Sequence, residues 1–401
     1  MTIWIIEPRD PLIVRDGRPF GPNPGARAVT LPFPLPSTIV GGLRHKAGLD
    51  DAGVFNRNEV ARVLGLDLRG PLLVELTAEG VLHQFLFPAP ADALALDADG
   101  SAPGVTELRI QALAPRALPG APTTNQPDGM ALVAPATRVP NKVSGAAPRF
   151  WHERHFSTWL TDPAPDVTFA LDAVGLRSLE SDARTHVSVQ PDTQTAREGA
   201  LFQTRGLEFT WCDRAAWTER EAFVTRRLAL AAAFEDAGRP YTPPHFPGGL
   251  APLGGERRLM RWSTLDAALP APPPGLFDAI VEAHRARVIL LTPALFAAGY
   301  RPPLTWVRGG VSANLRAAAV PRAQVISGWD LHQGKPKPTR RLAPAGSVYF
   351  VTWEPGADVR AWLEATWMRN VSDADQDRRD GFGLAALGVW PRYQGQTAGM
   401  L

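Results

Sequence analysis

The chain has 401 residues, of which 45% are hydrophobic and 20% are charged, so it can form two ordinary hydrophobic cores and is not compositionally disordered. Its 42 Lys and Arg residues almost balance its 40 Asp and Glu residues, which excludes a positive field over the whole chain. The single cysteine, Cys212, excludes an intrachain disulfide and a cysteine-based metal cluster. The sequence shows no signal peptide and no run of ~18 apolar residues, so we expect a cytoplasmic protein that does not span a membrane.

The first ~90 residues predict a strand, a long loop, two helices and a hairpin. Residues 2–6 form a short apolar run that predicts a strand, and residues 7–36 form a loop rich in Pro and Gly. A helix is expected to begin at Pro36, with Ser37 or Thr38 as its N-cap, and a second helix fits residues 57–65. Strands are expected at 71–77 and 81–87. This order is typical of a small open α+β sheet with helices on one face.

The middle of the chain is less regular. Residues 112–148 are rich in Pro, Gly and Thr and predict an extended insertion, whereas residues 150–160 look like a short amphipathic segment. Residues 184–211 alternate like a long hairpin with its tip near 190–194. Pro and Gly pairs near 235–255 mark a boundary, so we expect one domain at 1–235 and another at 236–401.

The second half repeats the α+β pattern. A helix fits 275–286 and an apolar strand fits 287–292. Two β-like stretches, 323–331 and 346–353, flank a basic loop at 335–341 that contains Lys335, Arg340 and Arg341. A helix at 357–368 leads through a charged loop to a glycine-rich stretch at 381–388.

The glycine-rich tail is the first candidate site. Gly381 and Gly383 would let an RNA backbone approach the peptide N–H groups, and Arg378 and Arg379 would add charge-assisted bonds to phosphates. The motif matches neither a Walker loop nor a dinucleotide fingerprint. A plain turn into a last strand explains the same residues.

Metal and catalytic motifs are weak. An aspartate run at 373–377 lacks the glycine and the final bidentate acid of a calcium loop. His152 and His155 are spaced i, i+3, which does not match the zinc motif His-Glu-x-x-His. A general acid and base for RNA cleavage, formed by His45 with Lys46 or His186, stays open, although no spacing selects this pair.

Basic loops that contain aromatic residues lie at 9–20, 138–155, 184–205 and 329–341. Arginine or lysine on phosphates and aromatic planes under bases suit single-stranded RNA. Solvated loops of an arginine-rich protein have the same composition, so both interpretations stay open.

Several blocks run in order along nearly the whole chain. They are residues 7–20, 36–44, 186–202, 254–258, 327–330, 344–350 and 381–383. Each block is modest alone, but their order is specific. Together they resemble one family, the third subunit of type III-B CRISPR effector (Cmr) complexes, within the RAMP superfamily.

The resemblance implies an α+β fold of two ferredoxin-like (RRM-like) RAMP modules, with long loop insertions, a protruding β-hairpin and a glycine-rich loop. It implies a non-catalytic subunit without a cofactor that holds the repeat-derived 5′ tag of the crRNA. Its expected protein partners are the large polymerase/cyclase-like subunit and the backbone RAMP subunit, and it would meet target RNA only indirectly.

We expect the RNA-binding residues to lie in these blocks and in the basic loops. They are Arg15, Arg18, Phe20, Ser37, Thr38, Arg44, His186, Gln194, Thr195, Arg197, Lys335, Arg340, Arg341, Arg378, Arg379, Gly381, Phe382 and Gly383. The rival interpretations are a metal-independent endoribonuclease that processes repeat RNA and a protein scaffold that never touches RNA.

Overall fold

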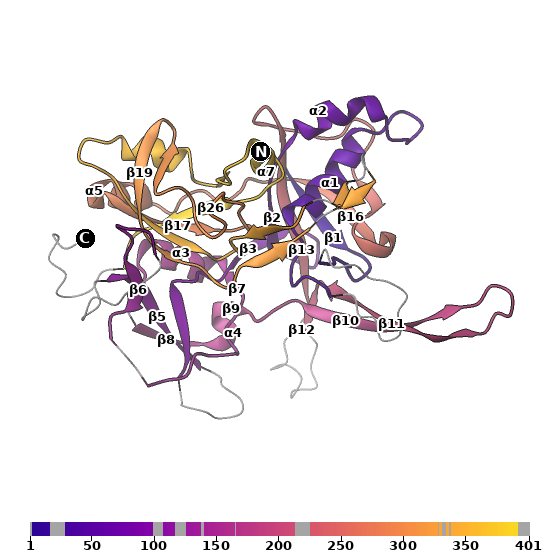
Figure 1. Cartoon of the computed structure of the whole chain (residues 1–401), viewed down its shortest axis with the longest axis horizontal. Helices are drawn as coiled ribbons and strands as arrows, with labels where there is room; N and C mark the ends of the chain where they lie inside the picture. The colour runs from indigo at the N-terminus through magenta and orange to yellow at the C-terminus, as the bar shows by residue number, and fades with distance from the viewer. Residues whose placement is uncertain are drawn as a thin grey trace. The chain divides into compact units, whose positions relative to one another are not determined.

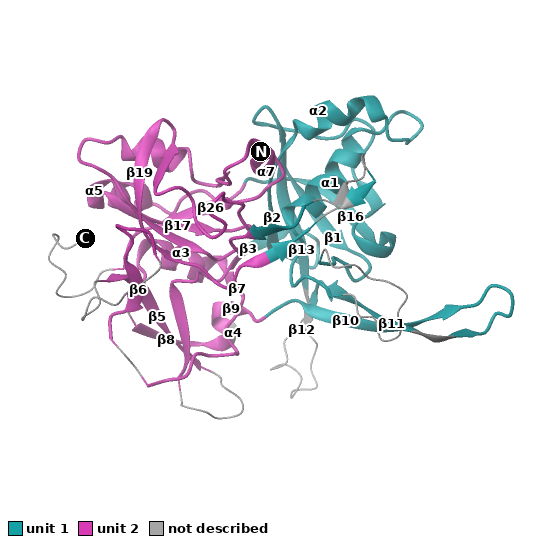
Figure 2. Cartoon of the chain, viewed as in Figure 1, with its two compact units in different colours: residues 1–84, 178–268, 325–341 teal, residues 85–177, 269–324, 342–401 magenta. Residues whose placement is uncertain are grey.

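The computed structural model describes residues 2–16, 29–98, 107–116, 126–137, 140–164, 166–212, 225–327, 329–330, 334–336 and 338–391. The chain divides into two compact units (Figure 2). Unit 1 comprises residues 1–84, 178–268 and 325–341, and unit 2 comprises 85–177, 269–324 and 342–401. The units therefore differ from the predicted consecutive domains 1–235 and 236–401. Each sheet is completed by strands that are far apart in sequence, and the composition of the predicted boundary carries no information about such pairing.

Unit 1 contains a four-stranded antiparallel module. Its strands, in chain order, are β1 (Thr2–Pro8), β2 (Asp67–Leu76), β13 (Thr225–Asp236) and β16 (Leu259–Asp266). They lie in the order β16-β1-β13-β2, and all three neighbouring pairs are antiparallel. The helix α1 (Pro36–Ala47) connects the first strand to the second (Figure 1). This fourth–first–third–second order is the ferredoxin-like arrangement.

The core of this module follows from its sequence pattern. Ile3 to Ile6 are all buried in β1, as expected for a central strand covered on both faces. Helix α1 buries Ile39, Val40 and Leu43. Its N-cap is Leu35, which makes no side-chain cap bond, so the prediction that Ser37 or Thr38 caps this helix was wrong. Pro36 begins the helix instead, because its fixed φ suits the first helical position.

Other elements complete unit 1. The second predicted helix is confirmed as η1 (Arg57–Glu59) followed by α2 (Val60–Leu64). Between the third and fourth strands there is only β14 (Arg239–Pro240), β15 (Gly249–Pro252) and η3 (Gly255–Arg257). This module therefore keeps one of the two crossover helices of a complete ferredoxin-like fold.

Unit 2 contains a second module with the same strand order. Its strands are β17 (Arg285–Leu290), β19 (Val311–Ala319), β24 (Val348–Thr352) and β26 (Leu384–Gly388). They lie in the order β19-β24-β17-β26 with antiparallel neighbours, and β18 (Thr305–Arg308) and β25 (Arg369–Asn370) extend the two edges. Helix α6 (Val359–Glu364) connects the third strand to the fourth, and α5 (Leu276–Ala283) precedes the first and contacts α6. The predicted α+β class with two ferredoxin-like modules is confirmed.

The long insertion also belongs to unit 2. Strands β4 (Ala93–Asp97), β5 (Glu107–Arg116), β6 (Leu132–Pro135) and β8 (Asp166–Ala170) form one sheet. Strands β3 (Leu82–Pro88), β7 (Phe150–His152) and β9 (Gly175–Leu176) pair in that order in a different sheet, and α3 (Glu153–Thr161) and α4 (Leu171–Val174) also lie in this part of the chain. The insertion is thus larger and more structured than the predicted stretch 112–148. The prediction missed its strands because short strands show little periodicity in the sequence.

The predicted long hairpin is confirmed. Strands β10 (Glu180–Val189) and β11 (Ala196–Glu208) pair from Glu180 opposite Glu208 to Val189 opposite Ala196. Beyond its base the hairpin extends away from the rest of unit 1 (Figure 1). Strand β12 (Thr210–Cys212) follows it and pairs with β13. Because a two-stranded hairpin has little core of its own, its position depends on contacts at its base.

The remaining short elements are β20 (Gln324–Ile326), β21 (Trp329–Asp330), β22 (Lys335–Pro336), β23 (Arg340–Leu342) and α7 (Asp375–Arg379). None of the helices in the described ranges is long and apolar enough to cross a membrane.

Candidate nucleic-acid interface

The segment 9–16 lies against the base of the hairpin. Leu12 and Leu207 form a two-way backbone bridge, with N···O distances of 2.9 and 2.8 Å. A Cβ at Gly206 would lie 2.5 Å from the Cβ of Pro11, a separation that real Cβ contacts do not reach. Glycine at 206 therefore allows the N-terminal segment to pack directly on β11.

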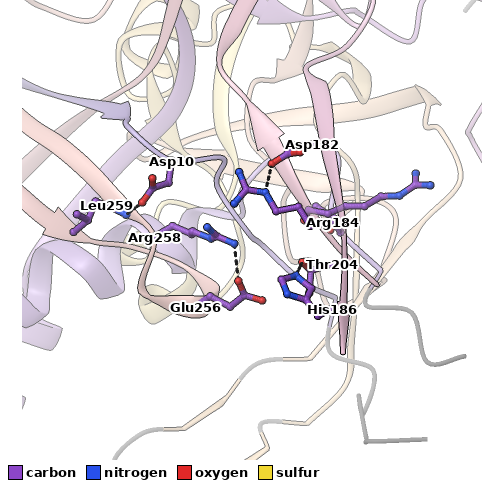
Figure 3. A network of polar contacts seen from close by, with 10 residues as sticks. Asp10, Asp182, Arg184, His186, Thr204, Glu256, Arg258 and Leu259 are labelled. Carbon is purple, nitrogen blue, oxygen red and sulfur yellow. Dashed lines mark hydrogen bonds and ion pairs between the residues drawn. The ribbon is translucent and has the colours of Figure 1, made fainter. Parts of the chain in front are cut away.

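The same segment also contacts the turn 254–259. The N–H of Gly255 donates to the carbonyl of Ile13 at 2.8 Å, and the N–H of Arg9 donates to the carbonyl of Leu259 at 3.0 Å. The N–H of Leu259 donates in return to the carboxylate of Asp10 at 3.0 Å (Figure 3). Segments 9–16, 180–208 and 254–259 thus converge within unit 1, and we call them the hairpin-base corner. Three of the blocks that carried the family resemblance meet here.

Several arginines lie in the segments of this corner, and two of them form ion pairs. Arg184 pairs with Asp182 at 2.6 Å, and Arg258 pairs with Glu256 at 2.7 Å (Figure 3). Three further side chains are exposed and make no ion pair or side-chain hydrogen bond with any other described residue, namely Arg9, Arg205 and Arg257. Guanidinium groups without an internal carboxylate partner are suited to bind phosphate through two donors at once.

An aromatic platform lies on the hairpin, on the same face as Arg184. The rings of His186 and Phe202 stack with centroids 5.0 Å apart and an interplanar angle of 16°. Nε2 of His186 is 2.8 Å from the hydroxyl of the buried Thr204, which fixes the orientation of the imidazole. A flat pair of rings on the same face as an arginine has the features used to stack a base of single-stranded RNA.

The hairpin tip presents the predicted polar residues to solvent. Gln194, Thr195 and Arg197 are all exposed. Gln194 adopts a left-handed backbone with φ of 54°, and the hydroxyls of Thr193 and Thr195 are 2.8 Å apart. The contact of these residues with RNA stays a prediction.

The sequence also placed RNA contacts on α1. Arg44 is only 7% exposed and donates to the carbonyls of Leu66 at 2.6 Å and Leu64 at 3.3 Å, so its guanidinium serves the fold. Ser37 and Thr38 are partly exposed in the first turn, and their role stays a prediction.

The acid–base alternative involved His45 and Lys46. The Lys46 ammonium is buried 4.0 Å from the centre of the Trp262 ring and 5.0 Å from that of Phe246. Burial lowers the pKa of Lys46 to about 8. His45 stacks on Phe55 with centroids 5.4 Å apart, and burial and the neighbouring Lys46 lower its pKa. The enclosed ammonium of Lys46 is thus unsuited to contact a substrate.

The glycine-rich tail in unit 2 does not form the expected cradle. The N–H groups of Gly381, Phe382 and Gly383 donate to the carbonyls of Arg378, Asp377 and Pro293 at 3.0, 3.0 and 2.8 Å. All three residues are buried. A Cβ at Gly383 would lie 2.8 Å from the amide nitrogen of Ser372. The cradle argument was therefore wrong, because the amides it needed complete internal hydrogen bonds.

The two arginines before this loop differ. Arg378 donates to the carbonyl of Ser372 at 2.7 Å and to that of Asp373, and it pairs with Asp375. Arg379 is exposed. Of the pair, Arg379 is the better placed to contact another molecule.

The remaining predicted residues fall into two groups. Lys335, Arg340 and Arg341 are exposed in unit 1, as is Arg15 at the corner. Arg18 and Phe20 lie outside the described residues. No group of three or more His, Cys, Asp or Glu side chains in the described ranges is arranged to hold a metal ion.

Sequence reasoning missed Arg9, Arg205 and Arg257 as site residues. In the structure, Gly206, Gly254 and Gly255 each lie where a Cβ would approach segment 9–16 within 3 Å. A glycine forced by close approach indicates that two segments meet, which spacing along the chain does not reveal.

Comparison with known proteins gives a family and two related structures. Two cryo-EM structures of the Type III-B Cmr-beta bound to cognate target RNA, one of them also with AMPPnP, each contain a chain that resembles this one. Identities are 13% and 15%, TM-scores are 0.43 and 0.45, and each match covers 87% of this chain and 86% of the other. No curated protein sequence matches significantly. The model of the family described as CRISPR-associated protein (Cas_Cmr3) matches residues 4–390, and the chain therefore belongs to that family.

Proposed function

We propose that this chain is the non-catalytic crRNA-binding subunit of a type III-B effector complex and that it holds the repeat-derived 5′ tag. Membership of the Cas_Cmr3 family supports a place in such a complex. The observation that carries the RNA-binding role is the hairpin-base corner, whose segments carry both the stacked His186–Phe202 pair and three exposed arginines without an ion pair among the described residues. In the proposed complex the chain also docks on the large polymerase/cyclase-like subunit and the backbone RAMP subunit, and meets target RNA only through them and the crRNA.

The chemistry of the corner fits a single strand better than a duplex. Arginines bind phosphates irrespective of base, and a ring pair stacks on a base only where that base is unpaired. The two rings form a cross-strand pair, because His186 lies directly opposite Phe202 in the hairpin. Arg184 and Thr204 form the next pair on the same face. Arg184 can therefore meet the phosphate of a nucleotide stacked on the ring pair, whereas Arg205, three residues from Phe202, points to the other face of the hairpin.

A non-catalytic role is supported by how the candidate acid–base groups are used. Lys46 is enclosed by aromatic rings, and the tail amides that would have faced a scissile phosphate are bonded internally. Incubation of the purified chain with repeat RNA tests this role directly. Intact RNA is expected, and site-specific cleavage would favour the endoribonuclease alternative.

The RNA-binding role is tested by removing charge from the corner within the assembled complex. We expect the double variant Arg9→Ala with Arg205→Ala to retain less crRNA, with the loss growing over ~0.2–0.5 M salt because phosphate contacts are salt-sensitive. Arg239→Ala is the matched control, because Arg239 is an exposed arginine in β14, away from the corner segments. Equal retention by the double variant and the control would refute the proposed interface.

A further inference from the structure

The turn 254–258 contains two consecutive strained residues. Glu256 and Arg257 have φ values of 54° and 50°, in the left-handed region that side chains with a Cβ seldom adopt. Glycine would take this conformation without strain, yet both positions carry long charged side chains. Strain of this kind persists where the surrounding structure enforces it, and it gathers at functional sites.

The surroundings do enforce it. Gly254 has φ of 73°, and a Cβ there would lie 2.5 Å from the carbonyl of Ile13. The Gly255 N–H is bonded to that carbonyl at 2.8 Å, and the Leu253 N–H donates to the carbonyl of Arg258 at 2.9 Å. Both ends of the turn are thus fixed against segment 9–16 and against each other, so residues 256 and 257 cannot relax independently.

The charges of the turn are not equivalent. Glu256 accepts from Arg258 at 2.7 Å, and the side chain of Arg258 is only 16% exposed. These two charges neutralise each other. Arg257 is exposed and has no ion pair or side-chain hydrogen bond among the residues that the structure describes. The turn therefore presents one uncompensated guanidinium on a rigid, strained backbone.

We propose that residues 254–258 form a phosphate-binding turn, in which the strained backbone aims Arg257 at one phosphate of single-stranded RNA. This inference rests on the proposed function and adds a specific contact to it. A rigid mount reduces the entropy that a long arginine side chain loses on binding. If the strain serves this contact, relief of the strain should raise Tm, whereas loss of the charge should lower the affinity for RNA.

The test uses the full chain in its assembled complex and a synthetic single-stranded RNA with the sequence of the repeat-derived tag. Arg257→Ala removes the charge and keeps the strain. We expect its affinity for the RNA to fall about tenfold and the slope of log K against log salt to decrease by about 0.7, the value for one phosphate on a single strand. Arg257→Lys keeps a charge at the same place and should retain most of the affinity.

Arg257→Gly removes both charge and strain. We expect it to raise Tm by about 2 °C while losing as much affinity as Arg257→Ala. The matched control is Ala237→Gly, because Ala237 is exposed with φ of 47° and carries no charge. It should raise Tm by a similar amount and leave RNA binding unchanged.

Each other outcome overturns the inference in a distinct way. Wild-type RNA affinity in Arg257→Ala would make the turn purely structural, and the proposed function would stand if Arg9→Ala with Arg205→Ala still lost affinity. Loss of complex assembly with normal RNA affinity would assign Arg257 to a protein partner. An unchanged Tm in Arg257→Gly would remove the strain argument. Failure of the wild-type complex to bind the tag RNA would refute the proposed function itself.

Discussion

Substitution of Arg287 should strongly destabilise unit 2. Its guanidinium is fully buried and forms an ion pair with the equally buried Asp92. It also donates to the carbonyl of Val389 at 2.5 Å and to that of Trp159, and the Trp159 indole donates to Asp92 at 3.1 Å. This network joins strand β17, helix α3, the insertion and the end of the chain within one core.

Arg287→Met keeps most of the volume but leaves the Asp92 carboxylate buried without a counter-charge. Breaking a buried pair in this way costs about 3–5 kcal/mol. At about 2–4 °C per kcal/mol for a unit of this size, Tm should fall by about 10 °C. Thermal and urea unfolding of the full chain measure the change.

The double variant Arg287→Met with Asp92→Asn separates the ion pair from packing. Removing the stranded charge should recover at least about 1.5 kcal/mol relative to the sum of the two single variants, as contacting residues show coupling of about 0.5–3 kcal/mol. Additive effects, or a single Arg287→Met variant as stable as the wild type, would refute this reasoning.

Three further predictions concern single positions. Lys46→Met should stabilise the chain by about 1–3 kcal/mol at pH 7, because burial of the Lys46 charge destabilises the folded state and cation–π contacts only partly offset this cost. Burial lowers the Lys46 pKa to about 8 from its usual 10.5, so the wild type should gain stability between these pH values and the stability difference from the variant should shrink. A constant stability difference in urea titrations across this range would contradict the prediction. Gly383→Ala should lower the free energy of unfolding by about 1–3 kcal/mol, since φ is 87° and the new Cβ would meet the Ser372 amide. The crRNA retention of the folded complex should stay normal, and a selective loss of crRNA would support the hypothesis that the tail binds RNA. Gly206→Ala should displace segment 9–16 from the hairpin, because the new Cβ would approach Pro11. It should lower crRNA retention with only a small fall in Tm, whereas normal retention would contradict the proposed corner.

Local patterns predicted most of the individual elements. The apolar run at 2–6, the helix beginning at Pro36 and the alternation over 184–211 all correspond to elements of the structure. Such signals depend on residues near each other in sequence, where burial of one face sets the period. The fold class followed from the order of these elements together with the family resemblance.

Contacts between segments far apart in sequence could not be predicted in the same way. The two units interleave because β13 and β16 join β1 and β2 across a long insertion, and no local composition reports such pairing. The tail loop illustrates the same limit at the site. Glycines at 381 and 383 suit an RNA cradle and a buried turn equally well, and only the acceptors of their amides distinguish the two. Arg44 was misjudged for the same reason, since its acceptors lie some 20 residues ahead.

The central claim is that the hairpin-base corner holds the 5′ tag of the crRNA. Ultraviolet crosslinking of the assembled complex, followed by identification of the crosslinked peptides and nucleotides, tests it most directly. We expect crosslinks from tag nucleotides to the ring pair His186 and Phe202, and to peptides containing 9–16 or 254–258. Crosslinks of the tag confined to the tail around 378–383, or to other subunits alone, would contradict it.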